Sequence, residues 1–100
     1  MPRVYQRKTG NPYALPHNTY MRTVYVVRDY DRLRSQRAET ARRRVGAVER
    51  ALGELPPEYR KGVFEYMARG RAYPITAGIA TWRRQQQKFV WHVAALLDEC

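Results

Sequence analysis

The chain has 100 residues, a length that predicts a single domain with a thin hydrophobic core. It carries 19 Lys and Arg against 9 Asp and Glu, and its one cysteine, Cys100, excludes an internal disulfide and a cysteine-based metal cluster. The formal net charge of +10 favours phosphate polymers without specifying their sequence, so nucleic acid is the partner class that the composition predicts.

Residues 1–17 contain three prolines and few apolar side chains, which predicts a flexible basic arm. Arg3, Arg7 and Lys8 would allow this arm to follow a phosphate backbone, as basic arms do; an end without any binding role is the alternative. The remaining residues, 18–100, are predicted to form one helical domain.

A heptad seam runs from residue 20 to residue 55, beginning after Asn18 or Thr19 as the predicted N-cap. The seam is apolar at both ends and charged in the middle; its members are Tyr20, Val24, Val27, Asp31, Arg34, Ala38, Ala41, Val45, Val48, Leu52 and Leu55. Either one long helix continues through this charged middle part of the seam, or two helices fold back on each other at about residues 32–39. We expect two helices, because a small domain must pack its helices on one another. The seam then closes within the chain as a hairpin or between two copies as a coiled coil.

The second half has strong helix boundary signals. Gly53 suits a helix end, and Pro57 suits the first position of the next helix, which is expected over residues 57–69 and ends at Gly70. A very short helix is expected over residues 74–79, followed by a turn at Gly78.

The final helix is expected over residues 82–97 with Thr81 as its N-cap. A helix, a short helix, a turn and an amphipathic helix make the order of a helix-turn-helix, here over about residues 57–97. The sequence therefore predicts an all-α fold in which an N-terminal long helix or helical hairpin is followed by a helix-turn-helix.

The start of the final helix is the predicted DNA-reading surface. In the major groove Arg binds guanine O6 and N7, and Gln binds adenine N6 and N7. The residues expected to make such contacts are Arg83, Arg84, Gln87 and Lys88. The alternative is that this is an ordinary solvent-exposed polar face without a ligand. The predicted short helix and turn before it, together with the net charge, favour DNA binding. The run Arg42, Arg43 and Arg44 lies mostly off the seam. It is either an ordinary solvent-exposed face or a source of additional phosphate contacts.

Three residues are candidates for a partner interface. The helical period places Trp91 on the polar face of the final helix, opposite Trp82. There it would pack against the N-terminal helix or a second copy, or stack on a base. If the seam joins two copies, Tyr20 and Val24 lie in the homodimer interface.

Several function classes find no support in the sequence. There is no Ser/His/Asp arrangement, no Gly-rich phosphate loop and no metal-ligand spacing, and His17 and His92 stand far apart. We therefore expect no enzyme activity, no metal and no cofactor. No apolar run reaches membrane-spanning length and no signal-peptide pattern is present, so a cytoplasmic protein without membrane contact is expected.

Three segments, LPHNTYMRTVYVVRDYDRLR (15–34), AVERALGELPPEYRKGV (47–63) and AYPITAGIATWRRQQQKFVWHVA (72–94), together resemble a family. This is the family of small phage- and prophage-encoded regulators of Gram-positive bacteria described as RinA-like or sigma-factor region-4-like. The resemblance implies that the final helix is the recognition helix and that the protein acts on phage genes through promoter DNA and RNA polymerase. The chain departs from the family pattern at Gln85, where a large aromatic is expected, and in its short linker after Arg34.

These observations predict a phage-type transcriptional regulator that binds double-stranded DNA with its C-terminal helix. One alternative is a small phage-encoded inhibitor that binds a host nucleic-acid-processing machine. The other is an RNA-binding helical protein that depends on Tyr side chains or Trp91.

Overall fold

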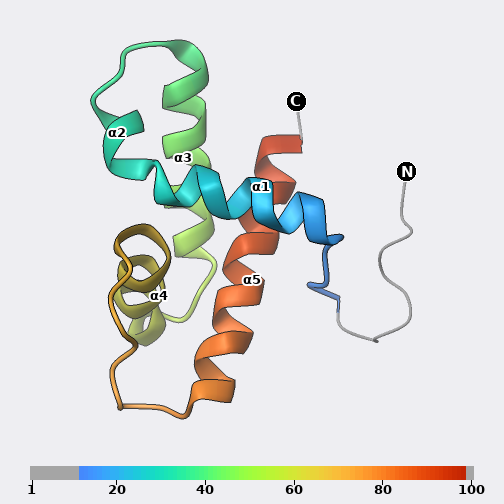
Figure 1. Ribbon diagram of the computed structural model, residues 1–100, viewed down its shortest axis with the longest axis vertical. Helices are drawn as coiled ribbons and strands as arrows, with labels where there is room; N and C mark the ends of the chain where they lie inside the picture. The colour runs from blue at the N-terminus through green and yellow to red at the C-terminus, as the bar shows by residue number, and fades with distance from the viewer. Residues whose placement is uncertain (1–11, 99–100) are drawn as a thin grey trace.

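The computed structural model describes residues 12–98, and these form an all-α fold without a strand. This confirms the predicted fold class at the level of its secondary structure. The helices, in chain order, are α1 (His17–Arg28), α2 (Tyr30–Arg34), α3 (Glu39–Gly53), α4 (Pro57–Arg69) and α5 (Ile79–Asp98) (Figure 1). The predicted basic residues of the arm, Arg3, Arg7 and Lys8, lie outside the described residues, and so does Cys100.

The chain folds back after α2, which packs on α3 as a short hairpin. The predicted seam does not close along its length, because α1 packs on α4 and α5 rather than on α3. The chain reverses between Arg34, where α2 ends, and Glu39, where α3 begins, inside the range expected for the fold-back. Apolar seam residues near both ends are buried, while Asp31 and Arg34 lie exposed near the tip of the hairpin. The two charged residues that interrupt the apolar seam are therefore exposed to solvent where the chain reverses direction.

A one-residue break at Asp29 separates α1 from α2. The carboxylate of Asp29 pairs with Arg32, which lies in the first turn of α2. Beyond this break, Asp31 accepts an ion pair from Arg69 of α4 at 3.1 Å. The Asp31–Arg69 pair ties α2 to α4, although exposed pairs such as these contribute little to stability.

The ends of α3 and α4 confirm the predicted boundaries at Gly53, Pro57 and Gly70. Arg60 of α4 caps the end of α3, because its Nε donates to the Leu55 carbonyl at 2.9 Å and its Nη2 to the Gly53 carbonyl at 3.2 Å. Gly70 has a φ of 70°, the left-handed conformation that ends helices and favours glycine.

The core lies where α1, α3 and α4 pack around α5. Helix α5 runs antiparallel to α3, its most extensive neighbour, and α1 lies across α5 (Figure 1). Fully buried side chains from four helices and from the α3–α4 connection meet there, and the largest are Trp82, Phe89, Leu55, Val27, Val48, Val63, Val90 and Val93.

Gly62 lets α4 approach α5 closely. A Cβ at this position would lie 2.6 Å from Cη2 and 2.7 Å from Cζ3 of the Trp82 indole, closer than carbon atoms can pack. The absence of a side chain at Gly62 therefore makes room for the indole.

The short helix expected over residues 74–79 is wrong: residues 70–78 form a non-helical loop up to the start of α5 at Ile79. The physical reason is tertiary. The Tyr73 ring stacks between Tyr66 and Trp82, and the Pro74 carbonyl accepts a hydrogen bond from the Trp82 indole at 3.1 Å. These contacts hold the loop against α4 and α5 without a helical turn.

Two predicted N-caps are also wrong. Helix α5 begins at Ile79, because the Trp82 N–H already bonds to the Gly78 carbonyl at 3.2 Å, and Thr81 lies inside the first turn. Helix α1 begins at His17 rather than after Asn18 or Thr19, because Pro16 precedes it and its carbonyl accepts the Tyr20 N–H at 2.9 Å.

We predict that Gly62→Ala lowers the free energy of unfolding by about 1–3 kcal/mol, since the new methyl group would overlap the indole. Gly46→Ala is the matched control, because Gly46 lies inside α3 with nothing within 4 Å of an added Cβ. That control should gain up to about 1 kcal/mol from helix propensity. Urea unfolding of both variants checks this, and equal stabilisation by the two would contradict the close approach at Gly62.

The Tyr30 hydroxyl donates to the Glu49 carboxylate at 2.6 Å. Burial, and then this hydrogen bond, raise the pKa of Tyr30 to about 12, above the value of about 10 expected in the unfolded chain. The neutral phenol therefore stabilises the fold fully below pH 10, and this contribution is lost as the pH rises from about 10 to 12.

We predict that Tyr30→Phe makes the stability depend less steeply on pH over this alkaline range. Urea unfolding at a series of pH values from 8 upward measures the two slopes. An unchanged slope in the variant would mean that Tyr30 is not the group responsible.

Candidate nucleic-acid interface

The first half of α5 presents a cationic face to solvent. Arg83, Arg84 and Gln87 are exposed and Lys88 is half-buried, as the helical period predicts. The first turn of α5 contains no acidic residue. Within residues 12–98, Arg83, Arg84 and Lys88 make no ion pair; Arg84 reaches only the Thr81 hydroxyl, at 3.4 Å. Their charges are therefore available to a ligand.

The opposite side of α5 holds this face in place. Trp82 and Phe89 are buried, and between them Gln86 bridges two tyrosines. The Tyr73 hydroxyl donates to Gln86 Oε1 at 2.7 Å, and Gln86 Nε2 donates to the Tyr20 hydroxyl at 2.8 Å. Because the bridge joins α1, the loop over residues 70–78 and α5, it fixes the rotation of α5 about its axis and so the direction in which Arg83 and Gln87 point.

The Tyr73 hydroxyl is protonated at neutral pH, as tyrosine hydroxyls ordinarily are, and donates to Gln86; burial raises its pKa further. The middle glutamine of the run Gln85-Gln86-Gln87 is thus structural, whereas Gln87 lies on the exposed face.

Two isoleucines beside the cationic face were not predicted. Ile75 is 99% exposed in the loop before α5, and Ile79 is 57% exposed in its first turn. Both come from a segment expected to form a short helix, where an apolar residue would pack inward. Their exposure follows from the loop conformation, which the sequence pattern did not indicate.

The structure does not bring Arg42, Arg43 and Arg44 to this face. All three are exposed at the start of α3, and Arg43 Nη2 donates to the Leu97 carbonyl at 2.9 Å, at the other end of α5. From residue 83 to residue 97 the helix rises by about 21 Å. Arg43 and Arg44 line a separate groove of about 240 Å³ with Arg22 of α1. The two arginine clusters therefore lie toward opposite ends of α5 and form separate basic surfaces.

The three candidate partner-interface residues are engaged inside the chain. Val24 is 5% exposed and belongs to the core. Tyr20 is half-buried in the bridge to Gln86. Trp91 is half-buried under the Tyr13 ring, with centroids 5.5 Å apart in a T-shaped arrangement. Trp91 therefore packs on the segment before α1, rather than on the N-terminal helix or a second copy as expected.

Among the described residues, no helix has both the length and the apolar character needed to cross a membrane. No cluster of three or more His, Cys, Asp or Glu within residues 12–98 is placed to hold a metal ion. Comparison with protein families, with curated proteins and with solved structures finds no match to this chain. The resemblance to phage regulators therefore stays a prediction from the sequence.

We predict that Gln86→Leu lowers the free energy of unfolding by about 1–3 kcal/mol, because it leaves the Tyr20 and Tyr73 hydroxyls without their shared partner. Gln85→Leu is the matched control, since the buried Gln85 Oε1 has no hydrogen-bond partner among the described residues. Thermal and urea unfolding compare the two substitutions. A larger loss in the control would refute the structural role of Gln86.

Proposed function

We propose that the protein binds double-stranded DNA and places the first half of α5 in the major groove. The observation that carries this proposal is the exposed face of α5, where Arg83, Arg84 and Lys88 have no ion pair within residues 12–98. Exposed cations that no carboxylate neutralises raise the affinity for phosphates, and Arg and Gln side chains can read base edges.

The distribution of ion pairs supports this choice of surface. Arg32, Arg69 and Arg71 form ion pairs with acidic side chains around α2 and α4. These ion pairs partly neutralise the three positive charges. The α5 face lies at the end of the molecule opposite the hairpin tip (Figure 1). A duplex could therefore approach α5 without meeting the acidic residues of α2.

A helix-turn-helix is part of the proposal, with α4 as its first helix and α5 as its recognition helix. The loop over residues 70–78 is longer than the turn of about three or four residues that usually joins such helices. In this arrangement the loop, rather than α4 alone, would pass close to the DNA backbone, and Ile75 at its tip could contact a thymine methyl group.

The resemblance to phage regulators supports a role in transcription, with promoter DNA as the site and RNA polymerase as a second partner. A basic cluster at the other end of α5, with Arg43 and Arg44, would then contact phosphates of a bent or neighbouring DNA segment rather than the same groove.

One observation favours the alternative of a small inhibitor that binds a host protein. Ile75 and Ile79 are exposed apolar residues at the N-terminal end of α5 and in the loop before it, and such residues often anchor protein interfaces. Because the same end of α5 is cationic, an acidic surface on a nucleic-acid-processing enzyme would be the matching target.

The test is selection of bound sequences from random duplex DNA, repeated at two salt concentrations. We predict an enriched motif, and a loss of at least about tenfold in affinity for it in Arg83→Ala/Gln87→Ala, since each good base contact contributes about 1–3 kcal/mol. The matched control is Gln36→Ala/Arg37→Ala, which removes the same two residue types from the exposed loop at the hairpin tip. The control should keep the motif and nearly all of the affinity.

Weak binding without a motif, abolished by salt and equal in both double variants, would contradict the proposal. A stoichiometric complex with a host protein that forms without DNA and is lost in Ile75→Asp would then establish the inhibitor. Preference for single-stranded RNA over duplex DNA would indicate the RNA-binding alternative.

A further inference from the structure

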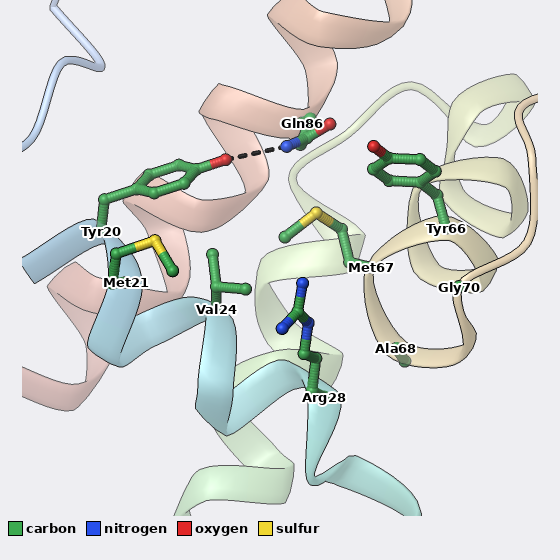
Figure 2. A pocket seen from close by; sticks show the side chains of 9 residues that line it. All are labelled: Tyr20, Met21, Val24, Arg28, Tyr66, Met67, Ala68, Gly70 and Gln86. Atoms are coloured by element: carbon green, nitrogen blue, oxygen red, sulfur yellow. Dashed lines mark hydrogen bonds between the residues drawn. The ribbon is translucent and has the colours of Figure 1, made fainter. Parts of the chain in front are cut away.

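A pocket of about 510 Å³ opens between α1, α4 and α5, on a side of α5 different from its cationic face. Gln86 and Tyr20 line it, while Arg83 and Gln87 do not. Figure 2 shows Arg28 and Met67 reaching into the space from α1 and α4, with Tyr66 at its edge. Its volume lies within the range of small-molecule sites.

One wall of the pocket is the end of a stack of aromatic rings. The Trp82 and Tyr73 rings are parallel to within 11° with centroids 4.8 Å apart, and the Tyr73 and Tyr66 rings to within 18° at 4.2 Å. Tyr66 is the last ring of this stack and is 41% exposed. Since Tyr73 covers one face of Tyr66, the other face is left for a planar ligand.

The remaining walls offer hydrogen-bond donors and a cation. The Tyr20 hydroxyl accepts from Gln86 Nε2, so its own proton is left to donate. Arg28 is exposed and makes no ion pair within the described part of the chain; its guanidinium lies 5.8 Å from the Tyr25 ring centroid. No carboxylate lines the pocket. The free ring face, the donors and the guanidinium together match a flat heterocycle that carries an anionic group.

We propose that this pocket binds a nucleotide, with the base stacked on Tyr66 and the phosphate on Arg28. Stacking accepts any base because every base has a π face, whereas the Tyr20 hydroxyl and the Gln86 amide hydrogen-bond its edge. The ligand is either a free mononucleotide or one unstacked nucleotide of a single strand. Both present the same base and phosphate to the pocket. The proposal does not depend on DNA reading by α5, because the two surfaces share no residue.

The experiment is calorimetric titration of the full chain with adenosine monophosphate, adenosine and a short single-stranded oligodeoxyadenosine. Tyr66→Leu should weaken nucleotide binding by about tenfold or more, and Tyr66→Phe, which keeps the ring, should restore it. Arg28→Gln should weaken adenosine monophosphate by about fivefold and leave adenosine unchanged, because only the former carries a phosphate. The matched control, Arg22→Gln, removes an exposed arginine of α1 that lines the other groove.

Saturable binding of adenosine monophosphate with this pattern supports the proposal and assigns a free nucleotide. Binding of the oligonucleotide alone with the same pattern supports it and assigns a single strand. Absence of binding by both probes, or binding that Tyr66→Leu and Arg28→Gln leave unchanged, overturns it. Thermal unfolding verifies that each variant is folded. Duplex binding by the pocket variants should be unchanged, so failure here is distinguishable from failure of the DNA-binding proposal.

Discussion

The close packing of Trp82 on Gly62 is the constraint on which the arrangement of α4, α5 and their connecting loop depends. The indole is buried only because residue 62 has no side chain, and its N–H then binds the Pro74 carbonyl while its ring stacks on Tyr73. These contacts define one side of α5 as the inner side. The exposed cationic face is the geometric consequence, because side chains about half a turn away from Trp82 must point to solvent.

Charge is distributed unevenly over this scaffold. Carboxylates of the hairpin and of α4 pair with nearby arginines, whereas Arg83, Arg84 and Lys88 at the start of α5 make no ion pair within residues 12–98. A second basic cluster, Arg22, Arg43 and Arg44, lines a groove at the far end of α5 together with Asp98. The two clusters are separated by most of the length of α5, so they would contact different parts of a bound duplex.

Local signals account for what the sequence predicted well. Pro57 has a fixed φ that suits the first turn of a helix, and Gly70 permits the left-handed conformation that ends one; with Gly53 they mark the ends of α3 and α4, which are confirmed to the residue. The exposed position of Arg83, Arg84 and Gln87 follows from helical period alone. Contacts between distant residues account for the errors: Tyr73 and Trp82 decide the loop over residues 70–78, and Tyr13 covers Trp91. Neither pairing has a signature in the sequence. The pocket beside Tyr66 could not be predicted either, because residues of three different helices line it.

The central claim is that the first half of α5 is the surface that meets DNA. The most direct test is to follow the backbone amide signals of the isotopically labelled chain by nuclear magnetic resonance as short duplex DNA is added at moderate salt. The account predicts that the largest shifts fall within residues 75–88, with smaller ones near Arg43. Shifts confined to the groove of Arg22, Arg43 and Arg44, with residues 79–88 unmoved, would contradict it.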